Sequence, residues 1–377
     1  MENFEGKRTL NHIYNEDYDK YLRVSEAKDC HIKVNGKWLI DTSMGCGTHL
    51  LGHNFSKDVV KKAISKGSLY ASPYYLADKC GDLLYEATGF DKFVFCNSGS
   101  EATLRAIRIA RAYTGRDKIA LFQGCWHGTH DWNLALYSKG IPQSVKDLVI
   151  VLPFTDKAFD IIQQERPALV MVEPIQGALP IDRKKFLTNL KVVTNRCGSV
   201  LCFDEVISGF RSELGGASEL FGITPDLVTY GKTIGGGFPV GVVGGNGVMD
   251  VTKTGVRMGG TFSANPITIN ACIGVLEYLL KNKNLYNTLQ KIEPFHTNRL
   301  QVISCGNIYR LLFTNQICND ISTRDEFESD RELQQIIVNN LRNSGVFINS
   351  NRLILFSTLH KDIHINKIVK ELNEQRL

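Results

Sequence analysis

The sequence lacks the features that would place a protein in a membrane or outside the cell. It contains no apolar run of the roughly 20 residues that cross a bilayer. The start, MENFEGKRTL, has no apolar core of signal-peptide length. The ten cysteines are dispersed from Cys30 to Cys318. They include no C-x-x-C pair, so their spacing does not indicate a zinc site. We therefore expect a cytoplasmic protein with reduced thiols, most of them acting as small buried apolar side chains.

An excess of charge of one sign is also missing. The net charge is only +5, and the Lys and Arg residues are interleaved with acids, so neither nucleic acid nor a membrane surface is indicated as a partner. Hydrophobic residues make up 43% and charged residues 22%, as in ordinary globular proteins. The 377 residues are enough for one large domain and a smaller one.

Two nucleotide-binding patterns are missing as well. The stretch TYGKTIGGGFPVG (229–241) ends a phosphate loop with Gly-Lys-Thr, but the first glycine of that pattern is replaced by Asp226. Its other glycines follow Lys232 instead of preceding it. The stretch GCGTHLLGH does not contain G-x-G-x-x-G. Lys232 therefore needs another explanation.

What the sequence does contain, from about residue 90 to 245, is a series of short apolar runs that alternate with amphipathic or loop segments. Such runs suit strands that are buried on both faces, as in a mainly parallel sheet covered by helices. The runs are FVFC (93–96), IALF (119–122), LVIVLPF (148–154), LVMVEP (169–174), VLCFDE (200–205), LVTYGK (227–232) and VGVVGG (240–245).

The segment EATLRAIRIARAY (101–113) predicts a helix between two of these runs. Small and apolar residues ending with Tyr113 fall on one face of this helix. We expect Arg105, Arg108 and Arg111 to form a solvated face.

The remaining segments predict a smaller α+β domain. Asn35-Gly36 predicts a hairpin turn, and a long helix is expected over PITINACIGVLEYLLKN. Short strands are expected at IYRLLF and LILFS, and helices around 330–343 and 362–375. We expect an N-terminal segment (1–42) that joins the small domain, a large domain (43–275) and a C-terminal small domain (276–377).

Polar residues gather where the predicted strands end. The run FVFC leads into NSGSEAT, which places Ser98, Gly99 and Ser100 at a helix N-terminus. Free backbone N–H groups and the helix dipole favour an anion there.

Further functional groups follow other strands. Trp126 and His127 come after IALF, while Glu173, Asp204 and Lys232 end three further runs. Because ligands bind at the carboxyl ends of parallel strands, these groups are expected on one rim.

Each of these groups alone has a structural explanation. Asp204 could pair with Arg211, Lys232 could cap a loop, and Trp126 could belong to the core. Together they suit pyridoxal 5′-phosphate. Its phosphate needs an anion site, its ring an aromatic or apolar sandwich, its pyridine nitrogen a carboxylate, and its aldehyde a lysine for a Schiff base. Burial and the pyridinium charge should make the Lys232 amine easier to deprotonate.

The sequence also resembles the class III pyridoxal-phosphate aminotransferases of fold type I, and within them the glutamate-1-semialdehyde aminomutase branch. Six stretches in family order are highly specific, where one would be weak. They are NSGSEAT, WHG, VEPIQG, FDEVISGFR, TPDLVTYGKTIGGGFPVG and GGTFSANPIT, between about residues 43 and 275. The resemblance implies an α/β fold with a mainly parallel central sheet, helices on both faces and a small α+β domain. The large domain would bind the cofactor.

Carried over by position, the resemblance assigns the reacting groups. Lys232 matches the Schiff-base lysine that shuttles the proton, and Asp204 matches the partner of the pyridine nitrogen. Val206 matches the residue on one ring face. Trp126 stands where the family usually has Tyr or Phe on the other face, and Gln176 matches a contact to the ring hydroxyl.

The resemblance also assigns the phosphate ligands. Ser98, Gly99 and Ser100 match the phosphate loop, with Ser100 in place of the usual Thr. Thr261 matches a phosphate ligand that the neighbouring subunit donates, which implies a homodimer with shared active sites.

The pair His127 and His130, beside Asp131, could suggest a metal. No further ligand group follows at matching spacing. We therefore expect no metal here, and we expect His127 near the cofactor as a hydrogen-bonding residue.

The N-terminal segment departs from the aminomutase branch. That branch usually has a Ser-Pro-Val-Arg stretch whose arginine holds the substrate carboxylate, and none is present here; Arg8 and Arg23 are candidate substitutes. The first hypothesis is therefore an aminotransferase that uses a small-molecule amine donor and a carbonyl acceptor. The second is an intramolecular aminomutase, and the third is a non-catalytic binding protein, against which the intact Lys232 and Asp204 argue.

Overall fold

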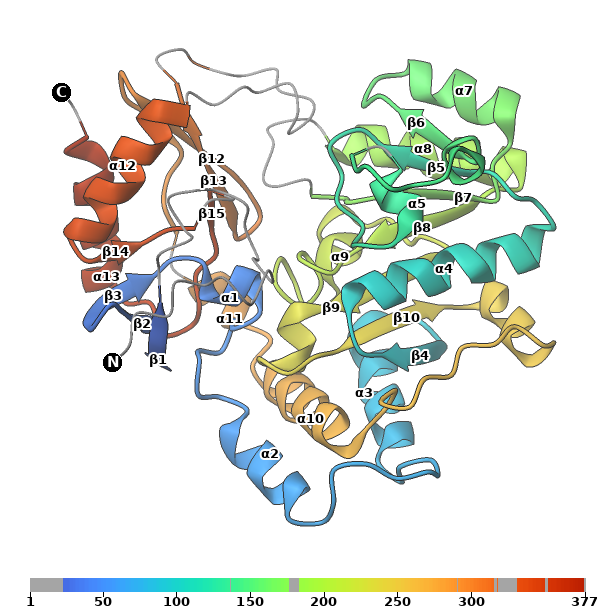
Figure 1. The fold of residues 1–377 in the computed structure, drawn as a ribbon, viewed down its shortest axis with the longest axis horizontal. Coiled ribbons are helices and arrows are strands. Elements are labelled where there is room, and N and C mark those ends of the chain that lie inside the picture. Colours follow the sequence, from blue (N-terminus) through green and yellow to red (C-terminus); the bar gives the residue numbers. More distant parts are fainter. Residues whose placement is uncertain are drawn as a thin grey trace.

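The computed structural model describes residues 23–135, 137–175, 183–289, 291–314, 317, 331–349 and 352–375. They form two lobes (Figure 1). The larger lobe contains a seven-stranded sheet, and the smaller lobe contains two four-stranded sheets.

The sheet of the larger lobe is mainly parallel. Only β10 runs antiparallel to its neighbours, β4 and β9. In spatial order the strands are β4 (Lys92–Cys96), β10 (Gly241–Gly245), β9 (Leu227–Gly231), β8 (Val200–Asp204), β7 (Leu169–Val172), β5 (Ile119–Phe122) and β6 (Val149–Leu152). All seven predicted runs are therefore strands of one sheet.

Helices cover both faces of this sheet, as predicted. Met171 of β7 packs in the core cluster on the side of α4 (Gly99–Thr114). Its neighbour Val172 packs on the other side, under α7 (Lys157–Glu165) and α8 (Arg183–Cys197). Successive strand residues point to opposite faces, so a strand buried on both faces is apolar throughout.

The prediction of a solvated arginine face on α4 is wrong for Arg105. Its side chain is buried and donates hydrogen bonds to the Phe95 carbonyl (2.7 Å) and the Ser263 hydroxyl (3.2 Å). Arg108 is exposed as expected, but Tyr113, expected on the apolar face, is 53% exposed. The difference arises because the segment that contains Ser263 covers this part of the helix, a contact that helical periodicity does not predict.

The other elements of the larger lobe lie around the sheet. They are α1 (Met44–Gly47), α2 (Lys57–Ile64), α3 (Ala77–Thr88), α5 (Asp131–Leu134), α6 (Gln143–Lys146), α9 (Gly216–Phe221), η1 (Lys232–Gly235), η2 (Gly247–Lys253), α10 (Pro266–Lys281) and α11 (Leu285–Thr288). The apolar side chains of α10 as far as Leu279 pack in one core cluster with Leu84 of α3. The same cluster includes Leu285 and Tyr286 of α11, so we propose that the large domain extends through α11 and not only to residue 275.

The smaller lobe combines the two ends of the chain. One sheet has the order β1 (Val24–Lys28), β2 (His31–Val34), β3 (Lys37–Asp41) and β14 (Val346–Phe347). The other has the order β11 (Phe295–His296), β12 (Leu300–Cys305), β13 (Ile308–Phe313) and β15 (Leu353–Ile354). The helices are α12 (Arg331–Asn343) and α13 (Asp362–Asn373).

The predicted turn at Asn35-Gly36 is confirmed. Both residues have positive φ, 49° and 84°, between the paired strands β2 and β3. Strand β3 then pairs in parallel with β14. This pairing supports the proposal that the N-terminal segment belongs with the small domain.

Within the described ranges, no helix combines the length and the apolar composition that crossing a bilayer requires. None of the nine cysteines described there forms a disulfide, and seven of them are buried, as expected for small apolar side chains.

Candidate active site

A cavity of about 720 Å³ lies at the carboxyl ends of β7, β8 and β9, where the larger lobe meets the smaller one. It brings together eight of the ten residues predicted from the sequence to hold a cofactor. These are Ser98, Gly99, Ser100, Trp126, His127, Asp204, Val206 and Lys232. Gln176 lies outside the described residues, and Thr261 lies elsewhere.

Lys232 stands directly after β9 and begins η1. Its backbone has φ of 44°, in the left-handed region that residues other than glycine rarely adopt. Burial lowers the pKa of the amine below its ordinary value of 10.5, although the Asp204 carboxylate opposes this shift. A buried amine is suited to nucleophilic chemistry because desolvation makes its neutral form easier to reach.

Asp204 ends β8 and is held by three hydrogen bonds. One carboxylate oxygen, Oδ2, lies 2.8 Å from Nδ1 of His127. The other, Oδ1, accepts from the Val206 backbone N–H and from the Thr229 hydroxyl, both at 3.1 Å. These contacts fix the position of the carboxylate.

The alternative in which Asp204 pairs with Arg211 is not observed. Arg211 is buried and donates instead to the carbonyls of Gly47 (2.7 Å) and Phe356 (3.0 Å). It thus links the loop at α1 to the strand region of the smaller lobe.

His127 is buried and held from several sides. Its backbone N–H donates to the side chain of Asn133 (3.1 Å), and its carbonyl accepts from the Thr103 hydroxyl (2.6 Å). The ring nitrogen Nε2 is buried and has no hydrogen-bond partner among the described residues. The second histidine of the motif, His130, contacts Thr103 through Nε2 (3.1 Å) and accepts from the Asn133 N–H (3.4 Å) through Nδ1.

The first turn of α4 lines the cavity. Ser98 is the N-cap residue and accepts from the Glu101 N–H at 3.1 Å. The WHG loop packs directly on this turn, because a Cβ on Gly128 would lie 2.4 Å from the Ser100 hydroxyl oxygen. Gly99 is equally constrained, since its Cβ would lie 2.9 Å from a methyl group of Val206.

Trp126 forms part of the cavity wall and not of the core. Its side chain is 46% exposed, which rules out the alternative of a core tryptophan. Its backbone N–H donates to Glu173 at 2.9 Å. Glu173, whose role the sequence leaves undefined, therefore holds the loop that carries the aromatic ring.

The sequence reasoning missed Arg310, which lines the same cavity from β13 of the smaller lobe. Arg310 is buried, with a relative exposure of 3%. The available signal was an arginine inside the otherwise apolar run IYRLLF. Of the two arginines named as candidates, Arg8 lies outside the described residues, and Arg23 does not line the cavity.

Thr261 lies on the surface, outside the lining of the Lys232 cavity. It lines a separate hollow of about 360 Å³ that also includes Tyr70 and Tyr74. Exposed apolar side chains surround it, with Phe262 at 59% and Tyr70 at 43% exposure. Within one chain, the structure therefore does not bring Thr261 to the other predicted cofactor ligands.

Comparison with known proteins identifies the family. The sequence profile of the class III aminotransferases matches residues 13–352. The chain belongs to this family. It is 36% identical to a glutamate-1-semialdehyde 2,1-aminomutase of Sulfolobus acidocaldarius, with 94% of each chain covered. It is also 36% identical to the enzyme of that name from Fusobacterium nucleatum subsp. nucleatum, over 82% of this chain and 78% of the relative.

Solved structures of a transaminase and of an aminomutase have the same fold. An omega-transaminase from Sphaerobacter thermophilus superposes with a TM-score of 0.85 at 28% identity, over 94% of this chain and 90% of that one. A glutamate-1-semialdehyde aminomutase variant from Pseudomonas aeruginosa, in complex with PMP, has a TM-score of 0.79 at 18% identity, over 94% and 87%. The fold is that of the fold type I pyridoxal-phosphate enzymes.

The residues of the cavity fit pyridoxal phosphate, the cofactor of this aminotransferase family. A helix N-terminus suits the phosphate, and a fixed carboxylate suits the protonated ring nitrogen. Trp126 and Val206 offer an aromatic and an apolar surface, and Lys232 is the amine of the set. Nε2 of His127 is buried and lacks a partner in the part of the chain that the structure describes, so it is one further polar group that a ligand could contact.

Proposed function

We propose that this class III aminotransferase moves an amino group between two molecules, from an amine or amino-acid donor to a ketone or aldehyde acceptor. The observation that carries the proposal is the pairing of Lys232 and Asp204 at the ends of adjacent strands in one cavity. Amino transfer requires a lysine amine and a carboxylate, and these two residues supply them. Burial favours the neutral, reactive form of the lysine.

Pyridoxal phosphate, when bound, supplies an electron sink for the carbon that carries the amino group. Lys232 is assigned the covalent attachment and the transfer of the proton at that carbon. Asp204 is assigned to hold the proton on the ring nitrogen, and His127 to keep that carboxylate in place. The ring lies between Val206 and Trp126 in this assignment.

The phosphate is assigned to the first turn of α4, with Ser98, Gly99 and Ser100 as its ligands. Gln176 remains the proposed contact to the ring hydroxyl. We further infer a homodimer in which Thr261 completes the phosphate site of the neighbouring subunit. The exposed apolar surface around Thr261 supports an interface there, because such patches mark association sites. The proposed location is the cytoplasm.

Arg310 defines the substrate class in this proposal. The lining of the cavity includes two cationic side chains other than histidine, Lys232 and Arg310. Lys232 is committed to the cofactor in this proposal, so we assign Arg310 the contact to an anionic group of the substrate. A guanidinium matches a carboxylate in two parallel hydrogen bonds, so we assign it the carboxylate of the donor or acceptor.

The alternative is an intramolecular aminomutase, the activity in the names of the relatives from Sulfolobus and Fusobacterium. The absence of a Ser-Pro-Val-Arg stretch favours the intermolecular reaction. A non-catalytic binding protein is least supported, because it would have no need for a buried lysine beside a fixed carboxylate.

Steady-state kinetics with paired substrates test the proposal. Amine donors with and without a carboxylate are combined with carbonyl acceptors. An intermolecular aminotransferase gives parallel double-reciprocal lines, whereas turnover of glutamate-1-semialdehyde alone, without any acceptor, establishes the aminomutase instead. No turnover of any pair would contradict both.

A second measurement separates the role of Arg310 from that of the cofactor groups. Arg310→Met should raise KM for carboxylate-bearing donors about 100-fold, corresponding to about 2.7 kcal/mol, because a charged hydrogen-bonded contact is lost. KM for an aryl-alkyl amine without a carboxylate should change little. Equal effects on both donors would show that Arg310 supports the fold and not the substrate.

A further inference from the structure

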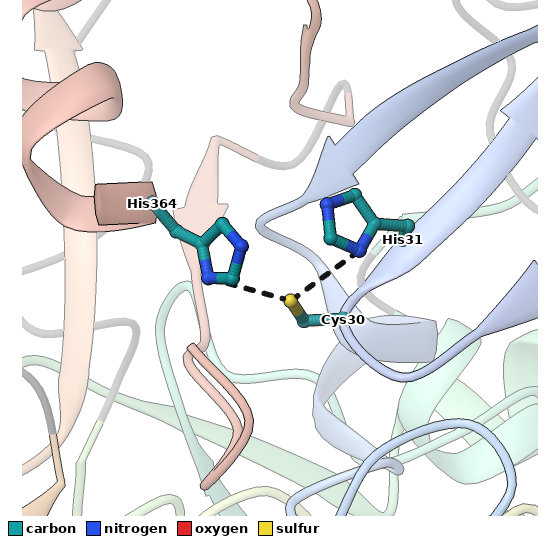
Figure 2. Close-up of side chains that lie close together, drawn as sticks. All are labelled: Cys30, His31 and His364. Atoms are coloured by element: carbon teal, nitrogen blue, oxygen red, sulfur yellow. Dashed lines mark hydrogen bonds between the residues drawn. The ribbon is translucent and has the colours of Figure 1, made fainter. Parts of the chain in front are cut away.

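A second cluster of reactive side chains lies in the smaller lobe, outside the active-site cavity. Cys30 stands at the turn between β1 and β2, His31 begins β2, and His364 lies in the first turn of α13. None of the three lines the Lys232 cavity. Figure 2 shows the Cys30 sulfur between the two imidazole rings.

The three ligand atoms converge closely. The Sγ atom of Cys30 lies 3.6 Å from Nδ1 of His31 and 3.7 Å from Nδ1 of His364, a residue 334 positions away in the chain. One atom from each side chain lies within 4.8 Å of the other two. In a tetrahedral zinc site, bonds of about 2.3 Å to sulfur and 2.0–2.1 Å to nitrogen place sulfur and nitrogen about 3.5 Å apart. The observed sulfur–nitrogen distances therefore need to change little for these atoms to bind one zinc ion.

Hydrogen bonds from the Cys30 thiol cannot satisfy all of its close neighbours at once. The Cys30 sulfur also lies 3.5 Å from the carbonyl oxygen of Leu359. A thiol has a single proton, so it can donate to one neighbour at a time. A cation would bind the sulfur and both imidazoles together.

Two costs oppose a metal at this place. Nδ1 of His364 accepts a hydrogen bond from the Lys361 N–H at 3.0 Å, and a metal bound to that atom would replace a contact worth about 1 kcal/mol. Burial also raises the pKa of the Cys30 thiol to about 11, so a metal has to displace the thiol proton. Both costs are small beside the ~10–16 kcal/mol of structural zinc sites.

We propose that Cys30, His31 and His364 bind one Zn²⁺ ion that fastens the N-terminal hairpin to helix α13. Thiolate and imidazole are both donors that Zn²⁺ accepts, and three of them leave a fourth tetrahedral position for water. We assign the bound ion a stabilising role. Its free energy of binding stabilises the pairing of the two chain ends and makes no use of the proposed amino transfer.

Metal binding to the cofactor-saturated protein tests the proposal. After removal of bound metal with a chelator, Zn²⁺ is titrated against a chromophoric competitor, and Co²⁺ serves as a probe of sulfur coordination. The wild-type protein should bind one Zn²⁺ per chain at this site, give a sulfur-to-cobalt charge-transfer band and melt at a higher temperature with zinc.

Cys30→Ser should lose the charge-transfer band and the thermal shift, and its zinc affinity should fall by more than about 100-fold. Cys305→Ser, which changes another thiol of the same lobe, should behave as the wild type. His364→Gln provides the same test should Cys30→Ser fail to fold. Equal zinc binding in Cys30→Ser, His364→Gln and the wild type, or no zinc uptake by the wild type, would overturn the site.

Discussion

At the scale of single residues, Lys232 combines a reactive amine with a left-handed backbone, φ 44°. A residue other than glycine in this region raises the free energy of the folded state by about 1–2 kcal/mol, and the surrounding structure compensates for it. Lys232→Ala keeps that cost, whereas Lys232→Gly removes it. Without cofactor, Lys232→Gly should therefore be more stable than Lys232→Ala by about 1 kcal/mol in urea unfolding, although both lack turnover.

Borohydride provides the matching chemical test of Lys232. Reduction of the wild-type holoenzyme should fix the cofactor to one peptide that contains this lysine. The two variants should bind the cofactor without a covalent link, because the α4 and Asp204 contacts remain. A label on a different lysine would contradict the assignment.

Asp204 is the residue whose charge matters most to the proposed chemistry. Asp204→Asn removes that charge but keeps the side-chain shape, so we expect proton removal from the substrate to slow by about 10³-fold, or about 4 kcal/mol of barrier. Thr229→Val is a matched control, since it removes only one hydrogen bond to the carboxylate, at 3.1 Å. Similar rates for Asp204→Asn and Thr229→Val in single-turnover measurements would be incompatible with the assigned role.

His130 should make the protein sensitive to acid. Burial lowers its pKa from 6.5 to about 4, and its Nδ1 accepts the Asn133 N–H at the start of α5. Between pH 6.5 and about 4 the unfolded chain therefore binds a proton that the folded chain does not. The free energy of unfolding should fall as the pH falls, by at most about 1.4 kcal/mol per unit from this group.

His130→Asn isolates this contribution. Asparagine caps a helix well and does not titrate, so urea unfolding between pH 7 and 4.5 should show a shallower slope in the variant. An unchanged slope would assign the acid sensitivity to other groups.

At the scale of secondary-structure elements, helix α4 has two roles. Its first turn lines the active-site cavity as the proposed anion site, and Arg105 on its flank holds Ser263, in the segment that carries Thr261. Arg105→Met should lower the free energy of unfolding by about 2–3 kcal/mol, because the Phe95 carbonyl and the Ser263 hydroxyl lose a charged donor. Arg108→Met, on the exposed side, should cost less than about 1 kcal/mol, and comparable losses in urea unfolding would contradict this difference.

The same helix illustrates what the sequence can predict. Strands buried on both faces are apolar throughout, and groups at the ends of parallel strands necessarily meet, so the sheet and the Asp204–Lys232 pair followed from local patterns. Arg105 and Arg310 did not. Their surroundings come from the segment around Ser263 and from docking of the smaller lobe, and neither contact leaves a periodic signal in the sequence.

At the scale of the whole molecule, the proposed dimer predicts complementation. Lys232→Ala and Thr261→Val chains are each expected to have little activity. In a mixed dimer one site would carry both changes and the other neither. A 1:1 mixture should therefore recover about a quarter of the wild-type activity once subunits exchange. Exchange without recovery, or a fully active monomer in sedimentation, would exclude Thr261 as a ligand across the interface.

The pairing of β3 with β14 also determines when the smaller lobe can form while the chain is being synthesised. The Thr42 hydroxyl donates to the Phe347 carbonyl across 305 positions of the chain. At ~5–20 residues per second, the N-terminal hairpin leaves the ribosome about 15–60 seconds before its partner strand exists. Meanwhile β3 presents an open edge, the kind of surface that other chains can pair with. The larger lobe can close around Lys232 during that interval, while Arg310 reaches the cavity only near the end, so the nascent enzyme would hold its cofactor groups before it could select a substrate.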